Sequence, residues 1–523
     1  MTQSPQQPNS AKRSGFTRFL DTVEYLGNLL PHPITLFALF AIAIVIGSGI
    51  ASYFGVTAQD PRPGGGVIEV VNLLNAEGLQ RIVTGLVTNF TGFTPLGTVL
   101  VALLGVGIAE RSGMLSAMMR GLVMNAPPRL VTVAVVFAGV ISNTAAELGY
   151  VVLVPLAAMI FHSLGRHPLA GLAAAFAGVS AGYSANLAIG TVDPLLAGIT
   201  TQAANLLDPD YVVGAEANWF FMAASTFLIA LMGTFVTEKI VEPKLGKYNP
   251  KEATINLKEQ TIEALTALEK RGLWGALLAF LVLAALLAWT IVPVDGILRD
   301  PKTGLVANSP FLQGIVVFIF ITFAIPGYVY GRITKVMRTD RDVIDAMSDS
   351  MSTMGMYIVL VFFAAQFVAF FGWTNLGTIF AVNGAEFLQN IGLTGPLLFV
   401  VFIFMCAFVN LSLGSASAQW AIFAPIFIPM LMLIGYAPEV IQAAYRIGDS
   451  VTNIITPMMS YFGLILAVAV RYKKDTGIGT MIAMMLPYTM VFIVGWTAFF
   501  MLWVFGLELP VGPGSPTYYQ IAP

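Results

Sequence analysis

Charged residues are scarce in this sequence. Only 10% of the 523 residues are Asp, Glu, Lys or Arg, while 57% are hydrophobic and the mean hydropathy is +0.80. Soluble domains carry about 25% charged residues. The composition therefore excludes an ordinary soluble domain and predicts an all-α polytopic membrane protein.

Residues typical of several other protein classes are also missing. The single Cys406 excludes a disulfide framework, and three histidines are too few for a His-rich metal site. A net charge of −2 argues against a nucleic-acid partner. The chain contains no H-E-x-x-H motif and no P-loop. An intramembrane enzyme is therefore a distant alternative, and the expected protein is not an enzyme.

Long apolar runs are the main feature that is present. A helix needs about 20 apolar residues to cross the hydrocarbon core, and the first run has no A-x-A-like cleavage site after it, so it is interpreted as a retained span. Nine spans are predicted, at about 33–53, 79–110, 168–190, 219–238, 273–293, 312–330, 353–372, 439–468 and 483–505.

Two further apolar regions, 129–163 and 396–436, are too long for one span. Small polar residues interrupt each midway, SNTAAELG at 142–149 and NLSLGSASAQ at 410–419. Because each leg is too short to cross comfortably, both regions are predicted to be re-entrant hairpins with polar tips at mid-membrane.

The positive charges support this topology. With the N-terminus inside and the C-terminus outside, 21 of the 26 Lys and Arg residues fall on the cytoplasmic side. The exceptions are Arg62, Arg81, Arg299, Lys302 and Arg446. This distribution is the positive-inside bias of membrane proteins.

The two halves of the chain carry similar motifs in the same order. TPLGT at 94–98 recurs as TNLGT at 374–378, and GYSAN at 182–186 resembles DSVTN at 449–453. By the predicted topology the two hairpins open to opposite sides, so the repeats are inverted, as in secondary transporters. The expected parts are 1–78 (N-terminal amphipathic segment, first span and outer loop), 79–200 (repeat 1), 201–352 (scaffold spans with a cytoplasmic linker at 239–272), 353–470 (repeat 2) and 471–523 (last span and outer tail).

Neutral oxygen ligands at the two tips suggest sodium sites. Asn143 in the first tip faces the span around Asn186, while Asn410 and Gly414 in the second tip face Asn453. Amide and hydroxyl oxygens suit a weakly held monovalent cation. The alternative is a set of ordinary hydrogen-bonded turns, which Asn and Ser also favour.

The stretch AYRIGDSVTNIITP at 444–457 places charge inside a predicted span. Arg446 and Asp449 share a helix face and are expected to pair, either as a structural salt bridge or as a substrate site in which Arg446 binds a carboxylate. Pro457 is expected to break the helix just beyond Asn453.

Other candidates have competing interpretations. Asp193, Asp449 and Glu147 are candidate proton carriers, although Asp193 also suits an Asp-Pro turn and Glu147 a hydrogen bond within the first tip. Trp420 is a candidate for stacking on an aromatic ligand, or it packs within the protein.

The longest motifs resemble one transporter family. VEYLGNLLPHPITLF, ISNTAAELGYVVL, GSASAQWAIFAPIF, YRIGDSVTNIITPMMSYFG and LPVGPG resemble the AbgT family of p-aminobenzoyl-glutamate transporters, and its Mtr-type branch in particular. The resemblance covers essentially the whole chain. It implies a bowl-shaped homodimer in the bacterial inner membrane. The implied substrate-binding residues are Asp193, Ser417, Trp420, Arg446, Asp449 and Pro457.

The expected function is secondary active transport of p-aminobenzoate-type aromatic acids, with export of sulfonamide antimetabolites by cation antiport. No cofactor is expected beyond the coupling ion, H⁺ or Na⁺ or both. The Mtr-type resemblance favours export by proton antiport. The alternative is a sodium-coupled importer of p-aminobenzoyl-glutamate, because the tip asparagines suit sodium.

Overall fold

The structure is a computed structural model that describes residues 31–60, 65–145, 149–254, 264–306 and 309–520. Within these ranges the regular structure is almost entirely helical, which confirms the predicted fold class. A small antiparallel sheet, β1 (Thr57–Gln59) with β2 (Val67–Glu69), is added in the loop after the first span. The sheet lies well away from the candidate site residues in the sequence.

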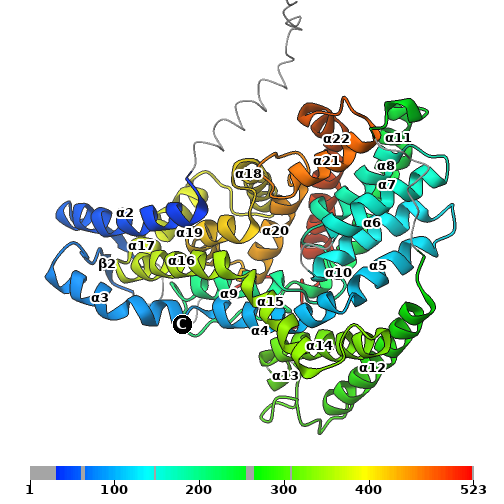
Figure 1. The fold of residues 1–523 in the computed structure, drawn as a ribbon. Helices are drawn as coiled ribbons and strands as arrows, with labels where there is room; N and C mark the ends of the chain where they lie inside the picture. Colours follow the sequence, from blue (N-terminus) through cyan, green and yellow to red (C-terminus); the bar gives the residue numbers. More distant parts are fainter. Residues whose placement is uncertain (1–30, 61–64, 146–148, 255–263, 307–308, 521–523) are drawn as a thin grey trace, which may run out of the picture.

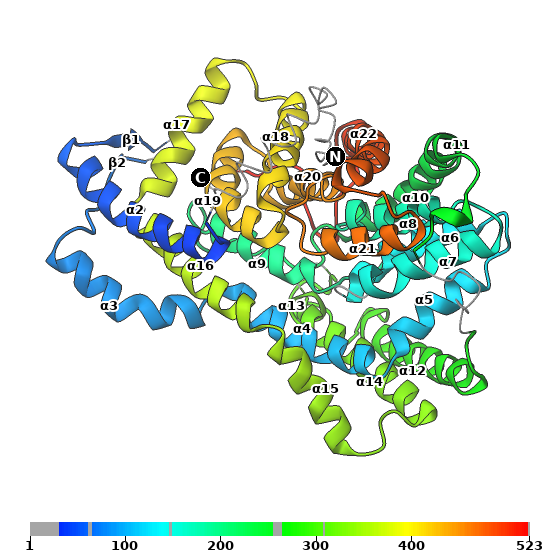
Figure 2. The ribbon, with the colours of Figure 1, turned by 45° about the horizontal axis from the view of Figure 1, so that its top comes forward.

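An arm on one side of the molecule holds the first spans (Figures 1 and 2). The second predicted span is two helices, α3 and α4, which meet at Gly92 and Phe93. Helix α2 packs along α16, and α17 lies against α19 (Ala416–Ile434). The bounds in this group are α2 (Pro33–Tyr53), α3 (Ala76–Thr91), α4 (Thr94–Arg111), α16 (Gly355–Trp373) and α17 (Leu376–Asn390).

The first hairpin region contains two short helices. The α6 helix has 12 residues, which at 1.5 Å per residue is about 18 Å and too short for the ~30 Å hydrocarbon core. The following span is interrupted: η3 ends at Ala181 and no helix resumes before Val192. The bounds here are α5 (Met114–Met124), α6 (Val131–Ser142), η1 (Asn143–Ala145), η2 (Gly149–Leu153), α7 (Val154–Ser163), α8 (Pro168–Phe176), η3 (Ala177–Ala181) and α9 (Val192–Ala204).

The middle of the chain forms a second arm, in which α12 packs on α14 and α14 on α4 (Figure 1). The predicted cytoplasmic linker contains two short helices before α12 begins, and its residues 255–263 lie outside the described ranges. The bounds are α10 (Trp219–Val236), η4 (Thr237–Val241), α11 (Glu242–Leu245), η5 (Pro250–Glu252), α12 (Ala267–Ile291), α13 (Pro310–Gln313), α14 (Ile315–Thr334) and α15 (Asp340–Ser352).

The second hairpin region turns at Gly414. This glycine has φ +52°, and a Cβ there would lie 2.8 Å from the carbonyl oxygen of Met458. The turn therefore requires glycine for both its backbone conformation and its close contact. The bounds are α18 (Leu397–Leu413), α19 (Ala416–Ile434), α20 (Pro438–Val451), α21 (Phe462–Tyr472), α22 (Ile478–Met501) and η6 (Leu502–Gly506).

Among the described residues, eight helices are long and apolar enough to cross a membrane. The predicted spans 168–190 and 439–468 are not among them because both are interrupted midway, whereas α19, predicted as a hairpin leg, is long enough. The count of nine spans and the inverted repeats therefore stay predictions. The eight are Pro33–Tyr53, Ala76–Arg111, Trp219–Leu245, Ala267–Ile291, Ile315–Thr334, Gly355–Trp373, Ala416–Ile434 and Ile478–Gly506.

Candidate functional site

Helix α20 has a buried polar face. Glu439, Gln442, Arg446 and Asp449 follow at spacings of three, four and three residues, which places them along one side of the helix. All of α20 is buried, so this face packs inside the protein rather than against lipid. The same spacing continues to Asn453, just beyond the end of α20.

The two interrupted spans contact each other where their helices stop. Arg446 donates from Nη2 to the carbonyl oxygen of Ser184 at 2.9 Å. The backbone N–H of Ser184 donates to Ser450 Oγ at 3.2 Å, and Asn453 Nδ2 donates to the carbonyl oxygen of Ser180 at 3.3 Å. Side chains at the end of α20 and just beyond it therefore satisfy backbone groups at the end of η3 and in the break that follows, as buried non-helical backbone requires.

The salt bridge of Arg446 differs from the predicted one. Its Nη1 lies 2.6 Å from Asp193 Oδ1, and the two side chains are 2% and 9% exposed. The other oxygen of Asp193 accepts from the backbone N–H of Gly190 at 2.6 Å. The break before α9 brings Asp193 to Arg446, so the pair joins the two halves of the chain and is not the predicted pair within α20.

Asp449 is buried with few partners. Its side-chain Oδ1 is 3.5 Å from the hydroxyl of Tyr445, and its Oδ2 has no hydrogen-bond partner in the part of the chain that the structure describes. A buried charged group without a partner is costly. This carboxyl group is therefore well placed to take a proton or to accept a hydrogen bond from a ligand.

Trp420 lies at the centre of the same site. It is fully buried, its ring stacks on Tyr445 with centroids 4.3 Å apart, and its Nε1 donates to Thr200 Oγ1 at 2.9 Å. Trp420 thus packs on a protein aromatic ring in this structure. Tyr445 also reaches Asp449, and Thr200 bonds to Gln442, one turn before Arg446 on α20. The aromatic pair and the polar face of α20 therefore belong to one site.

The first hairpin tip packs against the break that follows it. Asn143 Nδ2 donates to the carbonyl oxygen of Gly182 at 3.3 Å, and Thr144 donates to Asn186 Oδ1 at 2.7 Å. In the sequence, Asn143 and Gly182 are 39 residues apart, and Thr144 and Asn186 are 42 residues apart. Asn143 Oδ1 is buried and has no partner within the described ranges.

The second tip makes corresponding contacts. Asn410 Nδ2 lies 2.5 Å from the carbonyl oxygen of Asp449, 3.0 Å from Thr452 Oγ1 and 2.7 Å from Asn453 Oδ1. The first two partners are again 39 and 42 residues away. Asn410 Oδ1 is also buried without a described partner. Each tip therefore leaves one buried amide oxygen available for a ligand or cation.

The remaining predicted residues lie nearby or outside the description. Ser417 is half-buried in the first turn of α19, next to Ala416, whose carbonyl oxygen accepts from Tyr445 at 2.5 Å. Helix α20 ends at Val451. The break therefore starts before Asn453, not beyond it, and Pro457 lies within the irregular segment. Glu147 lies outside the described residues.

One short sequence pattern suggests hydrolase chemistry but lacks its structural context. Residues 178–182 read G-V-S-A-G and match the G-x-S-x-G motif of serine hydrolases. That motif needs a strand-to-helix turn that exposes the serine. Ser180 instead lies in the helical segment η3, where it is fully buried.

Three further residues of this site were not predicted from the sequence: Thr200, Gln442 and Tyr445. Thr200 and Gln442 bond to each other at 2.5 Å, and both are buried. The alternating three- and four-residue spacing of polar residues on α20 is a signal that would have identified Gln442. Thr200 has no comparable signal, because threonine is common in apolar helices.

Two interrupted helices meet at a buried charge pair, and a polar hairpin tip lies beside each of them. This arrangement is typical of a secondary transporter. The comparisons with known proteins give the family. The model of the AbgT putative transporter family matches residues 18–519, and the chain belongs to that family. It is therefore a multi-pass membrane transporter and not an enzyme.

The similar proteins cover nearly the whole chain. It is 38% identical to the p-aminobenzoyl-glutamate transport protein of Escherichia coli (strain K12), over 98% of each chain. The solved structure of Neisseria gonorrhoeae MtrF, described as illuminating a class of antimetabolite efflux pumps, matches with a TM-score of 0.91 and 65% identity, over 95% of this chain and all of that one. The YdaH transporter of Alcanivorax borkumensis matches with a TM-score of 0.85 and 44% identity, over 92% of this chain and all of that one.

Proposed function

We propose that this protein is a secondary active transporter of p-aminobenzoate-type aromatic acids, including p-aminobenzoyl-glutamate, and that it exports sulfonamide antimetabolites by proton antiport. One observation carries the proposal: the buried face of α20 carries Arg446 and, one turn earlier, Gln442. Gln442 bonds to Thr200, which accepts from Trp420, and the Trp420 ring stacks on Tyr445. An aromatic acid offers a carboxylate for Arg446 and a ring for the aromatic pair. The relatives' names point to the same substrates.

The substrate carboxylate would replace Asp193 as the partner of Arg446. Guanidinium groups bind carboxylates through two parallel hydrogen bonds, which gives both strength and orientation. Arg446 already makes one bond to a carboxylate and one to the Ser184 carbonyl oxygen. A substrate that takes both positions would be held at the break between η3 and α9.

Proton antiport would follow from competition at Asp449. The aryl amine of p-aminobenzoate or of a sulfonamide is a hydrogen-bond donor. Oδ2 of Asp449, which has no partner among the described residues, accepts strongly when the carboxyl group is ionised and becomes a donor when it carries the proton. Substrate and proton therefore compete for one buried group. A carrier that binds one or the other, but not both, exchanges them across the membrane.

The alternative coupling ion is sodium. The buried Oδ1 atoms of Asn143 and Asn410 are oxygen ligands, and Asn186, Gly414 and Asn453 lie beside them. These neutral oxygens fit a monovalent cation at each tip. Under this alternative the protein imports p-aminobenzoyl-glutamate together with sodium.

The proposal includes an inner-membrane location with a cytoplasmic N-terminus, a periplasmic C-terminus and a homodimeric state. The charge distribution of the sequence supports the orientation. The site residues Arg446, Asp449 and Trp420 are at most 2% exposed, so substrate can reach them only after a conformational change. Alternating access supplies such a change.

The test is flux through pure protein in liposomes loaded with labelled p-aminobenzoyl-glutamate or a labelled sulfonamide. A pH gradient alone and a sodium gradient alone are applied in separate samples. Flux driven only by the pH gradient supports proton antiport and directs attention to Asp193 and Asp449. Flux driven only by sodium supports the importer, and no flux in either case contradicts the substrate assignment.

A further inference from the structure

A buried chain of hydrogen bonds begins at Trp420. The indole Nε1 donates to Thr200 Oγ1 at 2.9 Å, and Thr200 lies about two turns after Asp193 on α9. Thr200 Oγ1 is 2.5 Å from Gln442 Oε1, and Gln442 Nε2 is 2.7 Å from Asn218 Oδ1. Asn218 Nδ2 then donates to the carbonyl oxygen of Glu439 at 2.7 Å.

The direction of the bonds in this chain is determined by its last member. The carbonyl oxygen of Glu439 only accepts, so Asn218 donates with Nδ2 and accepts with Oδ1, and Gln442 donates with Nε2 and accepts with Oε1. The hydroxyl of Thr200 therefore donates to Gln442 and accepts from the indole N–H, which can only donate. The chain ends on a backbone carbonyl oxygen, which only accepts. It therefore orients groups and does not carry a proton to the site.

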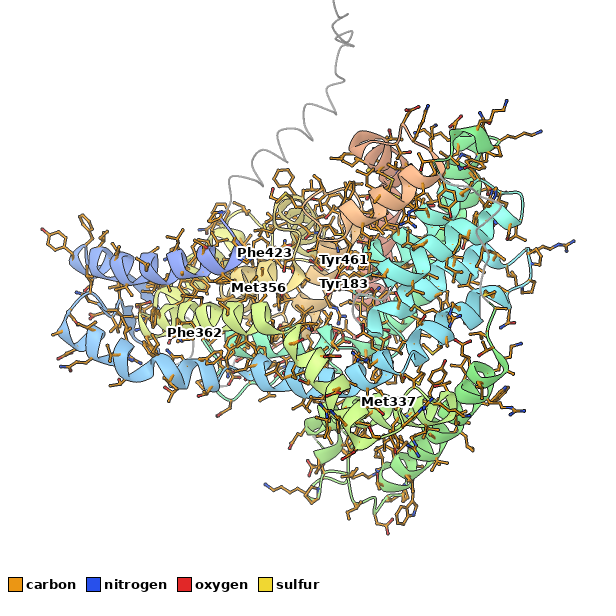
Figure 3. The ribbon with its side chains drawn as sticks, viewed as in Figure 1. Tyr183, Met337, Met356, Phe362, Phe423 and Tyr461 are labelled. Atoms are coloured by element: carbon orange, nitrogen blue, oxygen red, sulfur yellow. The ribbon has the colours of Figure 1, made fainter. Side chains whose placement is uncertain are left out.

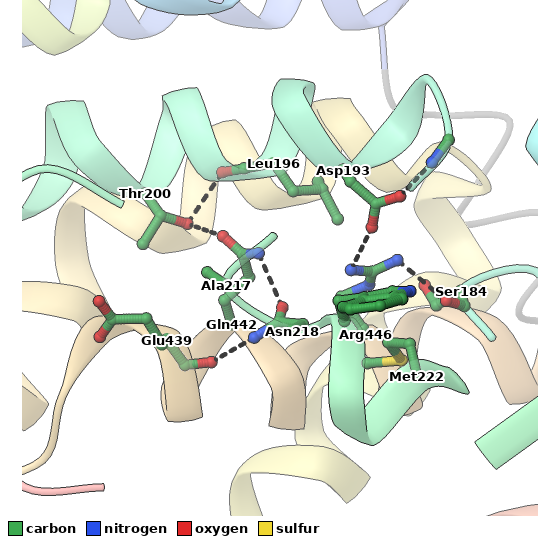
Figure 4. A network of polar contacts seen from close by, with 12 residues as sticks. Ser184, Asp193, Leu196, Thr200, Ala217, Asn218, Met222, Glu439, Gln442 and Arg446 are labelled. Atoms are coloured by element: carbon green, nitrogen blue, oxygen red, sulfur yellow. Dashed lines mark hydrogen bonds and ion pairs between the residues drawn. The ribbon is translucent and has the colours of Figure 1, made fainter. Parts of the chain in front are cut away.

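The chain joins segments that are distant in the sequence. Figure 4 shows Thr200 on α9 bonded to Gln442 on α20, and Gln442 bonded to Asn218, which precedes α10. Thr200, Gln442 and Asn218 are each at most 1% exposed. In a buried site a satisfied polar network fixes side-chain positions, and a lost member leaves a costly unpaired group.

We propose that Thr200, Gln442 and Asn218 are positioning residues, which hold the Trp420 indole against Tyr445 and link it to the loop segment 205–218. This inference rests on the proposed function, because the ring so positioned is the one that would meet the aromatic part of the substrate. When substrate displaces the Trp420 indole, the strain reaches α20 through Gln442 and the loop through Asn218.

The Thr200 variants separate this role from simple packing. Thr200→Val keeps the shape and removes the hydroxyl, so the Trp420 N–H loses its acceptor. We expect the dissociation constant for labelled p-aminobenzoyl-glutamate to rise about tenfold. Thr200→Ser keeps the hydroxyl and should stay within about twofold of the wild type.

Gln442→Met should have a smaller effect than Thr200→Val, roughly threefold. The hydroxyl of Thr200 can then donate to the Leu196 carbonyl oxygen, 2.9 Å away, and still accept from Trp420. If these residues only stabilised the fold, the two variants should weaken binding equally, because Gln442→Met also removes two hydrogen bonds, those to Thr200 and Asn218.

A double-mutant cycle gives the decisive comparison. Trp420→Phe removes the N–H that starts the chain, so adding Thr200→Val to it should weaken binding by less than about twofold. A full tenfold loss in that background would overturn the inference, since Thr200 would then act without Trp420. An unchanged affinity of Thr200→Val in the wild-type background would overturn it as well.

A second measurement needs no substrate. The full-length protein contains seven tryptophans, and labelling with 5-fluorotryptophan gives each of them a ¹⁹F resonance. The resonance that is absent from the spectrum of Trp420→Phe belongs to Trp420. That resonance should move in Thr200→Val and stay in place in Thr200→Ser; no movement in Thr200→Val would overturn the positioning role. If the resonance moves but the wild type binds no p-aminobenzoyl-glutamate, the proposed substrate fails and the positioning role stands.

Discussion

Arg446 and Asp449 lie three residues apart on α20, yet the structure gives them different partners. Arg446 reaches across to Asp193 and Ser184 in the first half of the chain, whereas Asp449 lies beside Tyr445 and its backbone carbonyl oxygen accepts from Asn410. One charge is compensated and the other is not. At the scale of single residues, this difference suggests separate roles in substrate binding and in proton exchange.

Arg446→Ala is expected to abolish binding of p-aminobenzoyl-glutamate, with the dissociation constant raised more than about 100-fold, because a buried charged hydrogen-bond partner is lost. Equilibrium binding to protein in detergent measures this. It should also destabilise the fold by about 3–5 kcal/mol, since Asp193 is left buried and unpaired.

Adding Asp193→Asn should restore the stability of Arg446→Ala and leave binding lost. Arg341→Ala is the matched control, because that side chain is 86% exposed. Normal binding by Arg446→Ala would mean that the salt bridge is only structural.

Asp449→Asn is expected to remove the pH dependence of substrate binding. In the wild type, affinity should fall as the pH is lowered, because a proton on Asp449 displaces the aryl amine donor. The amide of the variant keeps an acceptor oxygen but cannot be protonated in this range. Binding curves at several pH values show the effect, with the surface variant Asp345→Asn as control; a persistent pH dependence in Asp449→Asn would assign the proton to another group.

At the scale of helices, the sequence predicts where each element is interrupted better than it predicts what the interruption contacts. Small polar residues identified the tip at Asn143 and the turn at Gly414. Pro457 indicated a break near Asn453, but the helix already ends at Val451, before that residue. The Arg446–Asp193 bridge was not predictable, since helical spacing relates only residues on the same element. Folding of the two halves against each other creates that contact.

Gly414→Ala tests the turn between α18 and α19. The positive φ of +52° and the 2.8 Å approach of a Cβ to the Met458 carbonyl oxygen both oppose a side chain there. A left-handed conformation alone costs about 1–2 kcal/mol for an L-residue. We expect a lower melting temperature and slower flux.

The matched control is Gly395→Ala, at a glycine before α18 with negative φ and open space around its Cα. It should behave as the wild type does. Equal melting temperatures for Gly414→Ala and Gly395→Ala would show that the turn adjusts without cost.

At the scale of the whole molecule, the site residues Arg446, Asp449 and Trp420 are buried in this structure. Figure 3 shows Tyr183 and Tyr461, from the two interrupted spans, in the middle of the molecule. By contrast, a cavity of about 1680 Å³ lies between α5 and the arm of α12 and α14. We expect the interlocked spans to form one body that moves relative to the arms when the site opens.

A cross-linking experiment tests that motion. Gln202 on α9 donates to Thr94 on α4 at 3.0 Å, which joins the body to the first arm. Thr94→Cys with Gln202→Cys, made in a Cys406→Ala background and joined by mercuric ion, should stop flux, and a thiol reductant should restore it.

The matched pair Asn89→Cys with Gln366→Cys joins α3 to α16 within one arm, where the native side chains bond at 2.9 Å. Cross-linking that pair should leave flux unchanged, because both helices stay on the same side of the moving boundary. Continued flux through the fully cross-linked 94–202 protein would mean that α4 and α9 move together, and the boundary would then lie between α4 and the arm of α12 and α14.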